Sequence, residues 1–249
     1  MRAAVFSGTS EGKEIAEYLN SRHVDTLVCV ATEYGSEVMP PMEYVKVHTG
    51  RLDTVGIAQL IQGYDLVIDA THPFAQLVTK NIISACGIAG VRYIRLLRDE
   101  IKRDDVIYAA DIKEAAEYLK NTQGNIFVST GSKELEQYTV IKNYRDRLMV
   151  RALPVSEAVE KCAALGIKNT IFLKGPFSFE QNYEQFKTGN IKWLVTKSSG
   201  TNGGFEEKIK AAKALDINVI VIKRPQENGL DIVKAKALID EVIKCPQKL

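Results

Sequence analysis

The stretch Leu66–Ala75, with the sequence LVIDATHPFA, decides the fold of this chain. Its apolar run is typical of a strand buried on both faces of a parallel sheet, and it stops at Asp69, ahead of Thr71 and His72. In such sheets the ligand crevice lies just outside the carboxyl ends of the strands. The stretch therefore predicts one of two structures: a reactive strand end, or a turn in which Asp69 or Thr71 caps a helix whose first position is Pro73.

Strand patterns alternate with helical patterns along the whole chain, as in α/β proteins. In the first part we expect strands at 3–6 and 26–30, a strand ending at 69, a strand at 91–94, and helices at 13–19, 55–61 and 74–86. In the second part we expect strands at 106–109, 125–128, 148–152, 170–173, 192–195 and 218–222, and helices at 113–119, 156–165, 206–215 and 232–243.

Two parallel-sheet domains, residues 1–96 and 97–249, are preferred over a single wide sheet, because each part has its own complement of strands. The charged cluster at 95–105 interrupts the hydrophobic pattern and is interpreted as the linker between the two domains.

Composition excludes several classes of protein. The 249 residues carry a formal net charge of +2, which argues against a general nucleic-acid binder. No run approaches the roughly 20 apolar residues of a membrane span. The four cysteines are scattered without metal-ligand spacing, so we expect no metal site and reduced thiols in a cytoplasmic protein.

The loop after the first strand, Ser7–Gly12, has the sequence SGTSEG. Glycines allow backbone amides to approach a phosphate, and the start of the following helix favours negative charge. The loop matches neither the G-x-G-x-x-G fingerprint nor a Walker A motif. It therefore predicts either a nucleotide-binding loop or a plain tight turn.

Polar, glycine-bearing loops also follow strands in the second part of the chain. They are 129–133, 174–178 and 196–204, and their hydroxyls, amides and lysines suit carboxylate or phosphate groups. The alternative for the last of them is a flexible surface loop.

The chain resembles the precorrin-6A reductase family, including the cobalt-precorrin-6A reductases of anaerobic cobalamin synthesis. The resemblance covers nearly the whole chain and rests on eight motifs in family order. These are VFSGTSEG at 5–12, GRLD at 50–53, DATHPFA at 69–75, TGSKEL at 130–135, RALP at 151–154, LKGPFS at 173–178, VTKSSG at 195–200 and IKRP at 222–225. Ser7 departs from the glycine that the family usually has there.

The resemblance implies two Rossmann-like domains, each a parallel sheet flanked by helices, with the active site in the cleft between them. It implies NAD(P)H-dependent reduction of one macrocycle double bond of (cobalt-)precorrin-6A to (cobalt-)precorrin-6B. On this basis Gly8, Thr9, Ser10, Glu11 and Gly12 would hold the cofactor. Arg51 would meet a 2′-phosphate, or else pair with Asp53.

The same resemblance assigns the remaining site residues. Thr71 and His72 would lie beside the nicotinamide or the macrocycle edge, with His72 the best side chain for protonation and solvent the alternative donor. Cations and hydroxyls at the other strand ends would bind the acetate and propionate groups of the tetrapyrrole. These are Lys133, Arg151, Lys174, Lys197, Ser198 and Ser199.

Two other functions fit the residues: an NAD(P)H-sensing regulatory module, and a dehydrogenase of another small metabolite. The sequence leaves open NADH against NADPH, and a cobalt-containing against a metal-free substrate. Besides the tetrapyrrole we expect no nucleic-acid or membrane partner, and at most transient contact with other enzymes of cobalamin synthesis.

Overall fold

The computed structural model describes residues 1–97, 103–198 and 204–244. The chain forms two compact units, called unit 1 (Met1–Asp99 with Pro225–Leu249) and unit 2 (Glu100–Arg224). Within the described residues, no helix is long and apolar enough to cross a membrane.

Unit 1 contains a five-stranded parallel sheet in the order β3-β2-β1-β4-β5. The strands are β1 (Arg2–Ser7), β2 (Asp25–Val30), β3 (Val45–Thr49), β4 (Leu66–Ala70) and β5 (Arg92–Arg95). The chain runs outward through β1, β2 and β3 and then returns to place β4 beside β1, with Ser7 opposite Ala70. The strand order therefore reverses between β1 and β4, the point where doubly wound sheets bind ligands.

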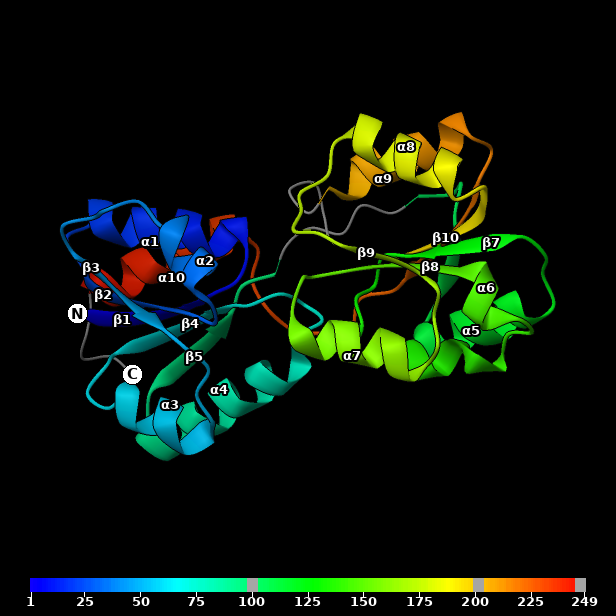
Figure 1. Cartoon of the computed structure of the whole chain (residues 1–249). Helices are drawn as coiled ribbons and strands as arrows, with labels where there is room; N and C mark the ends of the chain where they lie inside the picture. Colours follow the sequence, from blue (N-terminus) through cyan, green and yellow to red (C-terminus); the bar gives the residue numbers. More distant parts are fainter. Residues whose placement is uncertain (98–102, 199–203, 245–249) are drawn as a thin grey trace. The chain divides into compact units, whose positions relative to one another are not determined.

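Helices cover both faces of this sheet (Figure 1). Helices α1 (Ser10–Ser21) and α10 (Ile232–Lys244) lie on one face, and α3 (Thr54–Leu60) and α4 (Gln76–Ala89) on the other; the short α2 (Glu33–Glu37) follows β2. Alternate residues of β1 enter the two cores, since Ala3 and Val5 pack with the α1 side and Ala4 and Phe6 with the α3 side. This double burial explains the continuous apolar runs in the sequence.

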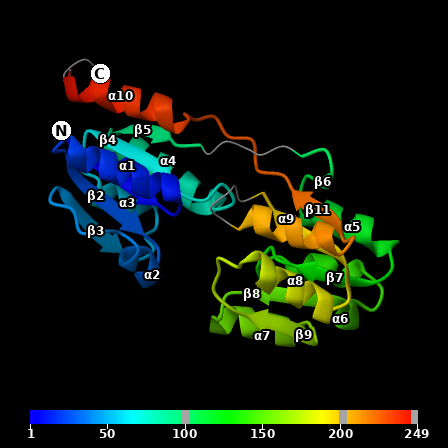
Figure 2. The same ribbon diagram turned by 90° about the horizontal axis from the view of Figure 1, so that it is seen from above.

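Helix α10 returns to unit 1 and packs beside α1, as Figure 2 shows. Ala235 and Ile239 are fully buried in the α1 core, and the Tyr18 hydroxyl donates to Asp240 Oδ1 at 2.7 Å. The chain therefore divides into its two units differently from the expected 1–96 and 97–249, because α10 packs its apolar face on α1 and so belongs to unit 1. This contact joins segments far apart in the sequence, so no local sequence pattern predicts it.

Unit 2 contains a six-stranded parallel sheet in the order β6-β11-β10-β7-β8-β9, and its strand order reverses between β7 and β10. The strands are β6 (Ile107–Ala109), β7 (Asn125–Val128), β8 (Leu148–Ala152), β9 (Asn169–Phe172), β10 (Ile191–Lys197) and β11 (Asn218–Ile222). Figure 1 shows α8 (Phe179–Thr188) and α9 (Phe205–Ala214) on one face. On the other face lie α5 (Ile112–Lys120), α6 (Tyr144–Arg147) and α7 (Ser156–Ala164), with the 3-10 helix η1 (Leu135–Val140).

Two separate parallel sheets confirm the predicted fold class, and the single wide sheet is wrong. Sequence analysis missed β3 and α8. Strand β3 lies at the edge of its sheet and is only partly buried, so it lacks the apolar run of a central strand. Helix α8 has few apolar residues, and Asn182 takes one of its buried positions.

Substituting Gly12 tests the close packing of α1 on the sheet. A Cβ there would lie 2.5 Å from Ser7 Oγ and 3.1 Å from Ala70 Cβ. We expect Gly12→Ala to lower the free energy of unfolding by about 1–3 kcal/mol, as overpacking does. Gly87→Ala on α4 is the matched control, because a Cβ at Gly87 meets nothing within 4 Å and should stabilise by roughly 0.5–1 kcal/mol. Urea denaturation measures both; equal stability of the two variants would contradict the packing argument.

Candidate functional site

Two loops meet at the carboxyl ends of β1 and β4. A Cβ at Gly8 would lie 3.6 Å from both the Thr71 Cα and the His72 backbone nitrogen, so the first loop and the Thr71–His72 segment are in direct contact. The structure therefore brings together the predicted cofactor loop and the two predicted catalytic residues. They are far apart in sequence and meet because β4 inserts beside β1.

Thr9 fixes the start of α1 against the end of β4. Its hydroxyl accepts from Gly12 N at 3.3 Å as the N-cap and donates to the Ala70 carbonyl at 3.0 Å. Ser10 Oγ donates to Glu11 Oε2 at 3.1 Å, and Glu11 lies in the first turn, where the helix dipole favours a carboxylate. Helix α1 thus begins at the point of strand reversal, close to Gly8, which has no side chain and so leaves room for a ligand to approach the backbone.

Asp69 is fully buried at the end of β4 and is the centre of a polar network. Its Oδ1 accepts from the Thr71 amide at 3.0 Å, the Thr71 hydroxyl at 2.6 Å and Arg95 Nη1 at 2.8 Å. Its Oδ2 accepts from the Tyr93 hydroxyl at 3.1 Å. Burial, and then the charge of Asp69, raises the pKa of the Tyr93 phenol, which stays a donor.

Arg95 extends the network to the last part of the chain. Its Nε and Nη2 donate to Glu227 Oε2 at 3.0 and 2.9 Å, and its Nη1 also donates to the Thr71 carbonyl at 3.0 Å. The Arg95 side chain is only 3% exposed, so the guanidinium is compensated inside the protein by Asp69 and Glu227. Sequence analysis missed both residues, because Arg95 stands in the cluster interpreted as a linker.

The helix-cap interpretation of Leu66–Ala75 is wrong. Helix α4 begins at Gln76, its N-cap is Ala75, and no side chain caps it. The expected first position at Pro73 therefore lies before the helix. The Asp69 carboxylate accepts instead from Thr71, Tyr93 and Arg95. A fully buried carboxylate needs several donors and an opposite charge, and a helix cap alone would not supply them.

Thr71 and His72 have different surroundings. The Thr71 hydroxyl donates to Asp69 and lies 3.2 Å from Thr79 Oγ1, so it holds the loop in place. His72 is half-buried, and its Nδ1 accepts from the Phe74 amide at 3.3 Å. That bond requires an unprotonated Nδ1, so the neutral ring carries its proton on Nε2.

Arg51 lies at the carboxyl end of β3, immediately after Gly50, whose φ of 137° and bond to the Val30 carbonyl fix the turn. The side chain of Asp53 caps α3 by accepting from Gly56 N at 2.8 Å. Within the part of the chain that the structure describes, the exposed Arg51 makes no ion pair with Asp53.

In unit 2, the ends of β7 and β10 bring Lys133 and Lys197 together. Lys197 Nζ lies 3.8 Å from Glu134 Oε2. Burial lowers the pKa of Lys197, the charge of Lys133 lowers it further, and the charge of Glu134 acts in the opposite direction. Ser198 is buried, and its carbonyl accepts from Arg224 Nε at 2.9 Å. Ser199 lies outside the described residues.

Arg151 and Lys174 lie at the neighbouring strand ends. Lys174 is exposed on the loop after β9. Arg151 is buried, and its Nη1 donates to Asn182 Oδ1 at 2.9 Å and to Gln185 Oε1 at 2.7 Å. Burial lowers the pKa of Arg151 to about 10.

Lys208 on α9 is a residue that sequence analysis missed. It is 7% exposed, and burial, followed by the charge of Arg151, lowers the pKa of its ammonium group to about 7. The signal was present, because Phe205, Ile209 and Ala212 are the buried face of α9 and helical spacing puts Lys208 among them.

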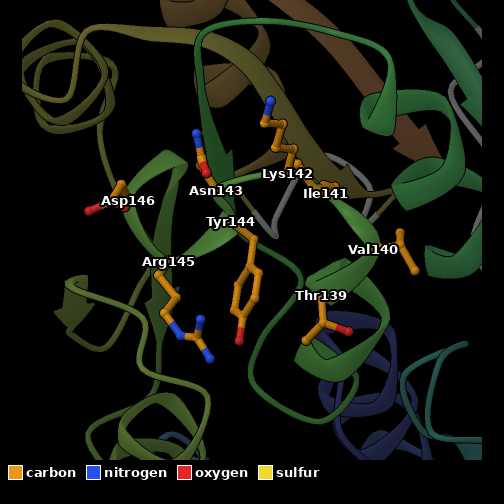
Figure 3. Close-up of a pocket in the computed structure, with 8 residues that line it drawn as sticks. All are labelled: Thr139, Val140, Ile141, Lys142, Asn143, Tyr144, Arg145 and Asp146. Carbon is orange, nitrogen blue, oxygen red and sulfur yellow. The ribbon is translucent and has the colours of Figure 1, made fainter.

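A cavity of about 390 Å³ between η1 and α6 is not part of this site. Figure 3 shows its lining, residues 139–146, which lead into the amino end of β8. That edge of the sheet is opposite the carboxyl ends where the predicted site residues lie, so we assign the cavity no role.

Comparisons with known proteins agree with one another. The family model described as Precorrin-6x reductase CbiJ/CobK matches residues 2–245. The cobalt-precorrin-6A reductase of Methanothermobacter thermautotrophicus is 33% identical over 92% of this chain and 78% of its own length. That of Priestia megaterium is 33% identical over 89% and 90%. The precorrin-6A reductase of Rhodobacter capsulatus is 26% identical over 93% and 91%. The solved structure of a CobK precorrin-6A reductase shares the fold, with a TM-score of 0.75, 21% identity and 97% coverage of both chains.

Removing the charge of Asp69 tests the buried network. Asp69→Asn leaves Arg95 with less compensation in a dry environment, so we expect the free energy of unfolding to fall by about 3 kcal/mol. Asp25→Asn breaks the exposed pair with Arg2 and should cost less than about 1 kcal/mol. Chemical denaturation compares the two; a loss at Asp69 no larger than that at Asp25 contradicts the assigned role.

The pH dependence of stability tests the burial of Lys208. Between its folded pKa of about 7 and the ordinary value of 10.5, the unfolded chain binds the extra proton, so stability rises with pH across this window. Lys208→Met removes the penalty. We expect the variant to melt at a higher temperature than wild type at pH 7 and the difference to shrink toward pH 10. A constant difference across these pH values would show that the ammonium group is not desolvated.

Proposed function

The chain belongs to the precorrin-6x reductase CbiJ/CobK family, and we propose that it reduces one macrocycle double bond of cobalt-precorrin-6A with a nicotinamide cofactor, giving cobalt-precorrin-6B. One structural observation carries the proposal: the Gly8 loop and the Thr71–His72 segment are in contact at the point of strand reversal. There a redox cofactor bound by the loop meets side chains able to orient a substrate and supply a proton.

The cobalt form is favoured by the names of the relatives. Three that are 32–33% identical over most of this chain are cobalt-precorrin-6A reductases, whereas the precorrin-6A reductase of Rhodobacter capsulatus is 26% identical. The metal would travel in the macrocycle and needs no protein ligand. We therefore expect a higher kcat/KM with the cobalt-containing substrate than with the metal-free one.

The residues of unit 1 fit a dinucleotide. Gly8 leaves space beside the Thr71 backbone, and Gly12 lets α1 pack directly on Ser7 and Ala70. The amino end of α1 then presents backbone amides to a pyrophosphate, with Ser10 and Glu11 in the first turn. When bound, the nicotinamide supplies a hydride. The protein's own contribution is to hold the two ligands and to exclude competing reactions.

Thr71 and His72 have separate roles in this proposal. Thr71 positions the loop through its bonds to Asp69, and His72 is the proton donor to the substrate carbon through Nε2–H of its imidazolium form, which leaves a neutral ring. The Phe74 amide bonds to Nδ1 only in the neutral ring, so this bond opens when the ring takes up its second proton.

Arg51 favours NADPH. It is exposed at the end of β3, directly beside the end of β2, where a dinucleotide-binding sheet receives the adenosine ribose. A guanidinium is the preferred partner of a phosphate, since it offers two parallel donors. Glu33, the acidic residue after β2, lies in the first turn of α2 and serves the helix dipole in this arrangement.

Cations at the strand ends of unit 2 bind the acidic periphery of the tetrapyrrole. They are Lys133, Arg151, Lys174 and Lys197, with the hydroxyl groups of Ser198 and Ser199 assisting. Lys133 and Lys197 lie near each other across β7 and β10, which suits one carboxylate held between two ammonium groups.

Anaerobic nicotinamide absorbance tests the function. We expect oxidation of NADPH only when cobalt-precorrin-6A is present, with one equivalent consumed for each equivalent of reduced macrocycle. Binding of NADPH without turnover would instead indicate a sensing module, and turnover with an unrelated small metabolite would indicate another dehydrogenase.

Replacing Arg51 tests cofactor choice. With Arg51→Ala we expect the KM for NADPH to rise about 10- to 100-fold, because the variant loses a charge-assisted hydrogen bond worth roughly 1.5–3 kcal/mol. We expect the KM for NADH to stay unchanged. Lys46→Ala removes the same charge from an exposed position of β3 and is the control. Equal changes for both cofactors would exclude the 2′-phosphate as the partner of Arg51.

Replacing His72 by asparagine keeps an acceptor for the Phe74 amide and removes Nε2. We expect His72→Asn to lower kcat about 100-fold or more, as loss of a general acid does, with the KM for NADPH within about twofold of wild type. His23→Asn is the control, because His23 is exposed with a φ of 55°, which asparagine tolerates. An unchanged kcat in His72→Asn would assign protonation to solvent.

A further inference from the structure

Among the described residues of unit 2, two buried basic side chains have no carboxylate partner. Arg151 on β8 is 6% exposed and donates to Asn182 and Gln185 of α8, and Lys208 on α9 is 7% exposed. Helices α8 and α9 cover the same face of the sheet (Figure 1). Within the described residues, neither Arg151 nor Lys208 makes an ion pair with an acidic side chain. Buried charges are ordinarily paired, because removing an ion from water is costly.

The hydrogen bonds of Arg151 leave one edge of its guanidinium open. Both bonds come from Nη1, which donates to the neutral amide oxygens of Asn182 and Gln185 on α8. The Phe177 ring centroid lies 3.8 Å from the guanidinium carbon and holds the plane of the group. Among the described residues, Nε and Nη2 have no acceptor, and these two donors form the edge that matches a carboxylate.

Lys208 reaches the same region from α9. Its amide donates to the Gly204 carbonyl at 3.3 Å, so it lies in the first turns of the helix. Gly204 in turn packs on the loop, since a Cβ there would lie 3.6 Å from the Phe177 carbonyl oxygen. Lys208 and Arg151 also act electrostatically on each other. The first turn of α9, from which Lys208 extends, therefore packs beside Phe177, whose ring also covers the Arg151 guanidinium.

An apolar ledge lies at the same edge of the sheet. Leu153 and Leu173 follow β8 and β9, are 56% and 49% exposed, and are neighbours, because the Leu173 amide donates to the Ala152 carbonyl. Exposed apolar side chains next to a buried cationic pair suit a ligand that is flat and apolar at its centre and acidic at its rim. A small inorganic anion would gain nothing from the ledge.

We propose that Arg151 and Lys208 together form a carboxylate site, in which Arg151 Nε and Nη2 and Lys208 Nζ bind one acidic side chain of the tetrapyrrole substrate. The assignment rests on the proposed function for the identity of the ligand. It adds Lys208 to the substrate-binding residues. It also explains why two basic side chains lie side by side in a dry environment: a bound carboxylate would compensate their charge.

Steady-state kinetics with Lys208→Met test the site. The side chain keeps its length and loses its charge, and we expect the KM for cobalt-precorrin-6A to rise at least about tenfold, with the KM for NADPH unchanged. Lys210→Met is the matched control, since Lys210 lies on the same helix, is 60% exposed and pairs with Glu207. An unchanged substrate KM in Lys208→Met, or an equal rise in both variants, would overturn the proposal.

Equilibrium binding separates this inference from the proposed function. Calorimetric titration of cobalt-precorrin-6A into wild type and Lys208→Met, without NADPH, should show binding that is at least about tenfold weaker in the variant. If wild type binds the tetrapyrrole more tightly than the variant but does not reduce it when NADPH is added, the function fails and the carboxylate site stands. If wild type reduces it on addition of NADPH and the variant binds the tetrapyrrole equally well, the site fails and the function stands.

Inorganic phosphate distinguishes the source of the anion. We expect millimolar phosphate to leave the melting temperatures of wild type and of Lys208→Met each unchanged, and the tetrapyrrole to raise the melting temperature of wild type by more than that of the variant. Stabilisation of wild type by phosphate, absent in Lys208→Met and as large as that by the tetrapyrrole, would assign the pair to a phosphate group instead and overturn the carboxylate assignment.

Discussion

The buried carboxylate of Asp69 constrains much of unit 1. A charge with no exposed surface must be compensated within the protein, and Arg95 on the neighbouring strand supplies the compensation at 2.8 Å. Arg95 in turn bonds to Glu227, in the segment that leads to α10, and to the Thr71 carbonyl. One ion pair therefore fixes the end of β4, the loop that carries His72 and the path of the chain as it returns to unit 1.

The two units treat buried charge in opposite ways. In unit 1 the Arg95 guanidinium has carboxylates on both sides, so the network is complete without a ligand. In unit 2 neither Arg151 nor Lys208 makes an ion pair among the described residues, and the printed side-chain bonds of Arg151 go to the neutral amides of Asn182 and Gln185. A complete network gives rigidity and positions the backbone, whereas an incomplete one has binding energy available for an anion. This contrast separates structural charges from binding charges.

Both sheets place their polar loops by the same topological rule. Each reverses its strand order once, between β1 and β4 in unit 1 and between β7 and β10 in unit 2. Most of the described site residues that were predicted follow those strands, while Arg51, Arg151 and Lys174 lie at the carboxyl ends of β3, β8 and β9. Sequence analysis found most of these loops because a buried parallel strand has a clear apolar signature that stops abruptly. It missed β3 and α8, whose half-buried patterns are weaker.

The sequence by itself determined the alternation of strands and helices, the polar strand ends and the resemblance to a reductase family, because these depend on local patterns and motif order. Tertiary structure decided which distant residues meet. Arg95 was interpreted as part of a linker and proved to be the partner of Asp69, and Lys208, which sequence analysis missed, proved to be buried. The physical reason is that helical periodicity can place a side chain on a buried face, as it does Lys208, but the pairing of charges depends on contacts between elements far apart in the chain, on which local periodicity carries no information.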